Sequence, residues 1–103
     1  MKAIQVVKQG LAKVLEGVPT PQLRDGYVLV RTRAVAINPT DWKHIHNNPR
    51  LAGCTAGCDY VGTVEEVGPG VTKDFKKGDR IAGWVHGAWV FSLFSFFHPF
   101  LGL

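Results

Sequence analysis

Short runs of β-branched and apolar residues alternate with glycine and proline turns through most of the chain, and this spacing limits the fold more than any other feature. The runs at residues 2–7 and 12–16 are separated by Gln9-Gly10, which predicts a hairpin. Further strands are expected at three places, namely Tyr27–Ile37, Tyr60–Val67 and Arg80–Val85. Short strands joined by glycine turns predict a mostly β fold, an antiparallel barrel or sandwich.

One short helix is expected within this β pattern. The third run ends at Asn38-Pro39, and proline both lacks an amide hydrogen for a strand ladder and suits the first turn of a helix. The sequence therefore predicts a helix over Thr40–Ile45, with Asn38 as its N-cap. Residues 46–59 hold several Asn, Pro and Gly and predict a long loop, a place where binding residues often lie.

Size and charge exclude several classes of protein. The chain has 103 residues, enough for one small domain. Its net charge of +4 comes from scattered Lys and Arg, without the concentrated stripe that nucleic-acid binding needs, so no nucleic-acid partner is expected. The only cysteines are Cys54 and Cys58, and the N-terminus lacks a long apolar leader. These features predict a reduced, cytoplasmic protein.

The C-terminal end differs in composition from the rest of the chain. No Asp, Glu, Lys or Arg follows Arg80, and five of the six phenylalanines lie in the last segment. We expect residues 1–87 to form the domain and residues 88–103 to be an aromatic, apolar tail foreign to the fold, as an unspliced intron or a frame change would produce. The alternative is a membrane tail, because Ile81–Leu103 is an uncharged run about as long as the roughly 20 residues of a membrane-spanning helix.

Three stretches in series carry a family resemblance. They are residues 36–43, 57–68 and 75–83, which read AINPTDWK, GCDYVGTVEEVG and FKKGDRIAG. In order and spacing they resemble the N-terminal, GroES-like (alcohol dehydrogenase-like) domain of the medium-chain dehydrogenase/reductase superfamily. The amino-acid sequence of these stretches is most similar to that of zinc-independent fungal enoyl reductases that act in trans and to that of quinone-oxidoreductase-like proteins. The resemblance covers about residues 1–87.

The resemblance implies a fold, a reaction and a set of site residues. The fold is a partly open antiparallel barrel with a short helix, and the reaction is hydride transfer from NADPH to an activated C=C bond of a small molecule or acyl thioester, possibly on a polyketide synthase. Asn38, Pro39 and Thr40 would line the nicotinamide end of the cofactor. Thr40 and Lys43, three residues apart on the helix, would be catalytic and meet the developing enolate charge. The alternative for Lys43 is an exposed helical lysine.

Three other residues of these stretches are expected to have structural roles. Trp42 is expected to lie in the core and not on a binding surface, and Asp41 and Asp59 are expected to fix local backbone and not to act as acids.

No metal is expected. Zinc enzymes of the superfamily place their ligands at positions that here hold Asn38, Cys58 and Asp59, and an amide does not supply the anionic ligand that a cysteine provides. A rival zinc site would combine histidines and cysteines from the long loop, but their spacing matches no common zinc pattern. Its four members are His44, His46, Cys54 and Cys58.

The sequence contains no glycine-rich turn that opens a helix, the feature by which a Rossmann domain binds the pyrophosphate of a dinucleotide. We therefore expect the Rossmann domain to be absent, and the chain to be a truncated catalytic domain that is inactive alone and binds NADPH weakly. The competing interpretation is a small membrane-tethered or partner-binding β domain whose apolar C-terminal end serves as an anchor.

Overall fold

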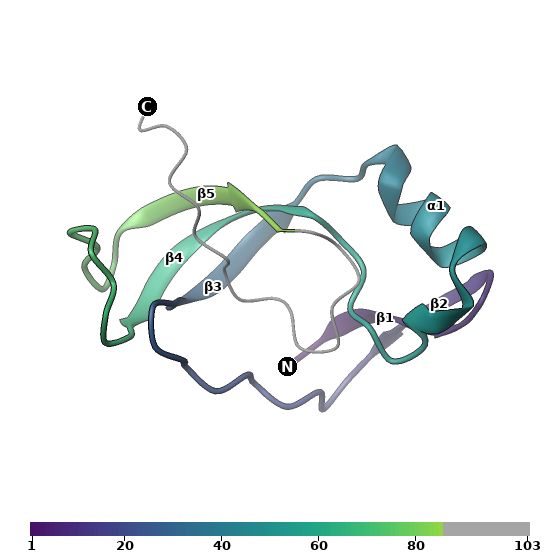
Figure 1. The fold of residues 1–103 in the computed structure, drawn as a ribbon, viewed down its shortest axis with the longest axis horizontal. Helices are drawn as coiled ribbons and strands as arrows, with labels where there is room; N and C mark the ends of the chain where they lie inside the picture. Colours follow the sequence, from purple (N-terminus) through teal and green to yellow (C-terminus); the bar gives the residue numbers. More distant parts are fainter. Residues whose placement is uncertain (86–103) are drawn as a thin grey trace.

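The computed structural model describes residues 1–85 and consists mainly of short strands (Figure 1). In chain order the elements are β1 (Ala3–Lys8), β2 (Leu11–Leu15), β3 (Val28–Val35), α1 (Pro39–Asn47), the 3₁₀ helix η1 (Pro49–Leu51), β4 (Asp59–Val67) and β5 (Arg80–Trp84). The predicted strands are all present, with ends that differ from the prediction by one or two residues.

The strands form two antiparallel sheets. β1 and β2 make the predicted hairpin, with Ile4 opposite Val14 and Gln9-Gly10 at the turn. β3, β4 and β5 make the second sheet in that order, and β4 lies in the middle. Among the strands of residues 1–85 the two sheets do not close into one barrel, which confirms the expected mostly β, partly open antiparallel fold.

The predicted helix is present and somewhat longer than expected. α1 begins at Pro39, whose ring suits the first helical position, and ends at Asn47. Asn38 adopts an extended backbone at its N-cap. Helix α1 lies at one end of the molecule, above the β1–β2 hairpin in Figure 1, and its C-terminal end is tied to that hairpin. Gly10 N–H donates to the Ile45 carbonyl at 2.8 Å, and Gln9 Nε2 donates to the His46 carbonyl at 2.8 Å.

The loop predicted at residues 46–59 is only partly irregular. It contains η1 and then runs beside β1, where an isolated bridge joins Gln5 and Thr55. Val6 exchanges two backbone hydrogen bonds with this loop, since its N–H donates to the Cys54 carbonyl at 2.9 Å and its carbonyl accepts from Gly53 at 2.8 Å. The loop therefore acts as a partner of the hairpin, and Cys54 and Thr55 are buried against it.

The core of the described residues is small and consists mostly of valines. Buried side chains come from β1, β3, β4, the loop and the end of β5, and they are Ala3, Val6, Val28, Val30, Cys54, Thr55, Val64 and Val85. Valine packs well on the pleated surface of a sheet, which accounts for its dominance.

The position of Trp42 differs from the one expected from the sequence. The tryptophan was predicted to lie in the core, yet 55% of it is exposed. The reason is the position of α1, which has no buried residue along its length and lies outside the valine core.

The proposed tail at residues 88–103 lies outside the described residues, and so does most of the proposed membrane segment. Its first part, Ile81–Trp84, belongs to strand β5. Within residues 1–85 no helix is both long and apolar enough to span a membrane.

Two glycines of the sheet have no space for a side chain. A Cβ atom at Gly62, in the middle of β4, would lie 2.5 Å from the Arg31 carbonyl oxygen and 2.6 Å from Val30 Cγ1. A Cβ atom at Gly83, on β5, would lie 2.8 Å from the hydroxyl of Tyr60. At Gly62 the nearest atom is backbone, which cannot move aside without disturbing the pairing of β3 with β4.

We expect Gly62→Ala to lower the free energy of unfolding by about 1–3 kcal/mol, because the new methyl group must displace the paired strand β3. Urea denaturation followed by circular dichroism measures this loss. Glu66→Ala, at an exposed position of the same strand, should change the stability by no more than about 0.5 kcal/mol. Equal losses in the two variants would contradict the steric explanation.

Candidate functional site

The start of α1 and the start of β4 lie side by side and form a cluster of polar side chains. Asn38 Nδ2 donates a hydrogen bond to Asp59 Oδ2 at 2.8 Å. This contact joins residues that are 21 positions apart, and both are partly buried. We call the set Asn38, Thr40, Asp41, Cys58 and Asp59 the N-cap cluster.

Asp41 connects the helix start to the cluster from the other side. Its Oδ2 accepts a hydrogen bond from the Asn38 backbone N–H at 2.7 Å, which is the carboxylate half of a capping box. Its Oδ1 lies 3.6 Å from Cys58 Sγ, which donates to it, and Thr40 Oγ1 lies 3.7 Å from the same sulfur. Three side chains of the helix start therefore contact residues 58 and 59.

The backbone at residues 58 and 59 is fixed by both neighbouring segments. The Ala36 N–H donates to the Asp59 carbonyl at 3.3 Å, and the Val85 N–H donates to the Cys58 carbonyl at 2.9 Å. Cys58 and Asp59 are thus held by the ends of β3 and β5, and the helix start attaches to them.

The structure places the predicted site residues in two groups. Asn38 and Thr40 belong to the N-cap cluster, and Pro39 lies exposed between them. Lys43 is also exposed, and its Nζ lies 5.7 Å from the centre of the Trp42 ring, in a cation–π contact. Lys43 thus contacts a neighbouring side chain of its own helix. Whether these residues act on a cofactor or substrate stays a prediction.

Sequence reasoning did not find the Asn38–Asp59 hydrogen bond. The signal for it was available, because both residues adjoin predicted strands that pair antiparallel, and in the structure Val35 is opposite Tyr60. In such a pair the chain leaving one strand lies next to the chain entering the other. The expectation that Asp41 fixes local backbone is confirmed by its bond to the Asn38 N–H.

The four residues of the rival metal site do not gather. Among residues 1–85, no group of three or more His, Cys, Asp or Glu side chains is arranged to hold a metal ion. Cys54 is 2% exposed and packs with the loop against β1, whereas Cys58 belongs to the N-cap cluster. Burial also raises the pKa of the Cys54 thiol, because desolvation disfavours its charged form.

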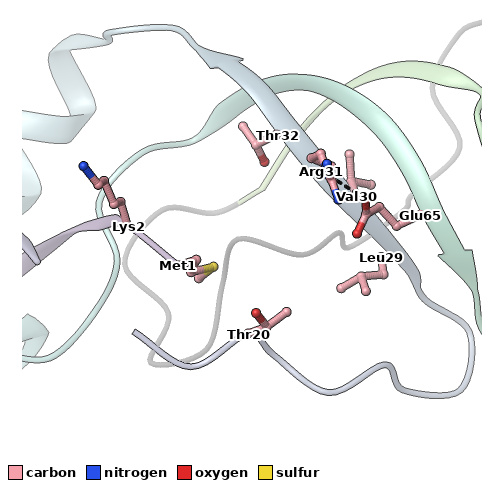
Figure 2. Close-up of a pocket in the computed structure, with 8 residues that line it drawn as sticks. All are labelled: Met1, Lys2, Thr20, Leu29, Val30, Arg31, Thr32 and Glu65. Atoms are coloured by element: carbon pink, nitrogen blue, oxygen red, sulfur yellow. Dashed lines mark ion pairs between the residues drawn. The ribbon is translucent and has the colours of Figure 1, made fainter. Parts of the chain in front are cut away.

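One hollow lies beside the N-cap cluster, and a larger one lies near the N-terminus. The one beside Cys58 and Asp59 has a volume of about 20 Å³, space for roughly one water molecule. A larger, open pocket of about 340 Å³ lies between the N-terminus, Thr20 and β3 (Figure 2). Its charged residues include Arg31 and Glu65, which form an ion pair across β3 and β4, and none of the predicted site residues lines it. Among the described residues, the hollow that adjoins the N-cap cluster is thus too small for a ligand larger than water.

We expect Cys58 to react with iodoacetamide faster than Cys54 in the folded chain, because Cys54 is buried and its raised pKa reduces the thiolate fraction at pH 8. Mass spectrometry of the peptide fragments measures the two rates. In concentrated guanidinium chloride the rates should become similar, since the protection comes from the fold. Equal rates in the native chain would contradict the burial of Cys54.

Several known proteins are similar to this chain in sequence and in fold. Residues 24–91 match the family described as alcohol dehydrogenase GroES-like domain. The chain is 54% identical over 87 residues to the trans-enoyl reductase resD of Aspergillus sclerotiorum, covering 84% of this chain and 24% of that protein. It is also 54% identical over 88 residues to the trans-enoyl reductase TOXD of Cochliobolus carbonum, covering 84% of this chain and 29% of that protein.

A solved structure agrees with the sequence comparison. A mycobacterial quinone oxidoreductase superimposes with a TM-score of 0.70 at 32% identity, covering 80% of this chain and 27% of that protein. The chain thus spans about a quarter of the length of the proteins it matches. Since the family match extends over more than half of its residues, the chain belongs to the family of alcohol dehydrogenase GroES-like domains.

Proposed function

We propose that this chain is the catalytic-domain part of an NADPH-dependent reductase that acts on an activated C=C bond. The observation that carries the proposal is the N-cap cluster, in which Asn38 and Thr40 are held against the start of β4 at hydrogen-bond distance. The names of the relatives, trans-enoyl reductases and a quinone oxidoreductase, support this reaction class. The domain would extend over residues 1–87, with residues 88–103 foreign to it.

The exposure of the helix start suits a cofactor wall. Pro39 and Thr40 are exposed and Asn38 is half-buried, so these three residues can face a flat ring while the cluster holds their backbone in place. Bound NADPH would supply the hydride. The hollow beside Cys58 is too small to enclose the ring, so the opposite wall would come from outside the described residues.

Thr40 and Lys43 would stabilise the charge that develops on the substrate. When hydride adds to the β-carbon of an enoyl compound, the carbonyl oxygen becomes negative, and donors placed near it lower the barrier. Thr40 would donate its hydroxyl hydrogen, and Lys43 would exchange its contact with the Trp42 ring for the oxygen. Both side chains are exposed on α1, within reach of a ligand that lies against the helix start.

The substrate class and setting follow from the same reaction. The substrate would be a small molecule or acyl thioester, as the word enoyl in the relatives' names suggests. A polyketide synthase would be the protein partner. The chain would work in the cytoplasm.

We also propose that the reaction is independent of zinc. Asn38 gives an N–H to Asp59, so at this position the chain presents an amide that is already hydrogen-bonded and not a thiolate. Amide groups are poor ligands for zinc compared with cysteine and histidine.

Elemental analysis of the purified chain is expected to find less than stoichiometric zinc. The physical reason is the missing anionic ligand at Asn38. One equivalent of zinc that disappears in the Cys58→Ser and His46→Ala variants would contradict the proposal and favour the rival site.

The chain alone should neither retain NADPH nor reduce an enoyl thioester, because one wall cannot hold the ring and the alkene at reacting distance. Joining residues 1–87 to the nucleotide-binding part of a close relative should produce NADPH-dependent alkene reduction, measured by the loss of absorbance at about 340 nm. NADPH oxidation by the chain alone in the presence of an enoyl thioester would contradict this expectation.

In the joined enzyme, Lys43→Met should lower kcat about 100-fold and Thr40→Val about tenfold, because each removes a donor to the enolate oxygen. Lys77→Met, at an exposed lysine remote in sequence from α1, serves as the matched control and should keep the parent rate. If Lys43→Met also keeps the parent rate, Lys43 is an ordinary surface lysine.

A further inference from the structure

We propose that Asp59 is a positioning residue, which fixes the start of α1 through Asn38 and so places Thr40. The inference rests on the proposed function for its catalytic meaning, but its structural content is independent of it. The contact that carries it is the 2.8 Å hydrogen bond from Asn38 Nδ2 to Asp59 Oδ2.

The first step is that α1 contributes no side chain to the buried core of residues 1–85. The helix has no buried residue, and its tryptophan is more than half exposed. Within residues 1–85, its tertiary hydrogen bonds lie at its two ends, to the β1–β2 turn at the C-terminal end and to residues 58 and 59 at the N-terminal end. The position of its first turn therefore depends on polar contacts.

The second step is that Asp59 provides the strongest of these contacts at the N-terminal end. A carboxylate that accepts an amide hydrogen forms a charge-assisted bond, whereas the two contacts of the Cys58 sulfur are long, at 3.6 and 3.7 Å. The Asp59 backbone is itself held by the Ala36 N–H. Asp59 is thus a fixed point to which the helix start is attached.

The third step is that the bond also sets the orientation of the Asn38 amide. An ionised carboxylate only accepts hydrogen bonds, so the nitrogen of the amide must face Asp59 and the oxygen must face away. The side chain cannot flip without placing two oxygens against each other. Asp59 therefore determines both where Asn38 lies and which of its atoms is available on the side away from β4.

The chain contains its own reporter for this arrangement. Cys58 is covered in part by Thr40 and Asp41 of the helix start, whereas Cys54 is buried against β1. A displacement of the helix start uncovers Cys58 alone. Unfolding of the whole domain uncovers both thiols, so the ratio of their alkylation rates separates the two events.

The test uses the 103-residue chain and iodoacetamide, with mass spectrometry to follow both cysteines. Asp59→Ala should speed the alkylation of Cys58 about tenfold, the factor that corresponds to 1.4 kcal/mol, while Cys54 stays protected. Asp59→Asn keeps an oxygen that can accept from Asn38 and should stay within about twofold of the parent rate. Asn38→Ala should match Asp59→Ala, and the double variant should be no faster, because the two residues act through one bond.

Several outcomes would overturn the proposal. They are an unchanged Cys58 rate in Asp59→Ala, an Asp59→Asn rate as fast as that of Asp59→Ala, and additive effects in the double variant. If Asp59→Ala unfolds the domain and exposes Cys54, Asn38→Ala provides the same test from the other side of the bond. Exposure of Cys54 in both variants would mean that the bond holds the whole fold and does not position the helix. Glu66→Ala is the control variant, because it removes an exposed carboxylate from the same strand.

The joined enzyme separates this proposal from the proposed function. With the parent sequence active, Asp59→Ala should lower kcat and leave the KM for NADPH nearly unchanged, and Asp59→Asn should recover most of kcat. If the parent enzyme is inactive, the proposed function fails while the alkylation result stands. If the parent enzyme is active and Asp59→Ala has the same kcat, the positioning role fails although the reductase function holds.

Discussion

The antiparallel pairing of β3 with β4 is the constraint on which the rest of the structure depends. It brings Val35 opposite Tyr60, so that the chain leaving β3 and the chain entering β4 run next to each other. The helix start follows β3 by a few residues, and Cys58 and Asp59 stand at the entrance to β4. The N-cap cluster is a direct result of this strand register, and a shift of the register by one residue would separate its members.

The two ends of α1 are fixed by different parts of the fold. The N-terminal end is attached to the three-stranded sheet through Asn38 and Asp59, and the C-terminal end is attached to the hairpin through Gly10 and Gln9. The helix therefore bridges two sheets that do not close on each other. Since none of its residues is buried, the helix can carry exposed polar groups such as Thr40 and Lys43 without loss of core packing.

The sequence was sufficient to predict the five strands and α1, though not the 3₁₀ helix η1, because the signals for strands and for the helix are local. Glycine turns, β-branched runs and the Asn38-Pro39 pair indicated the strands and the helix, and three motifs in series indicated the family. The contacts between segments were harder to predict. The docking of Cys54 and Thr55 on β1 depends on chain segments almost 50 residues apart, and composition does not report such pairing. Trp42 was assigned to the core because aromatic residues usually contribute to cores, but the position of its helix left it exposed.

The crowded glycines of the central sheet also affect how the family resemblance is interpreted. Gly62 and Gly83 lie within the motifs that carry the resemblance, and each stands where a neighbouring strand leaves no space for a side chain. Gly62 therefore reflects how closely the β3 backbone approaches, and Gly83 reflects the packing of the Tyr60 side chain against β5. Both are steric requirements of the sheet and carry no information on the reaction. Information on chemistry is concentrated in the few polar positions at the ends of β3 and β4. Two domains of this family could thus agree at every glycine of the sheet and still differ in the molecule they recognise.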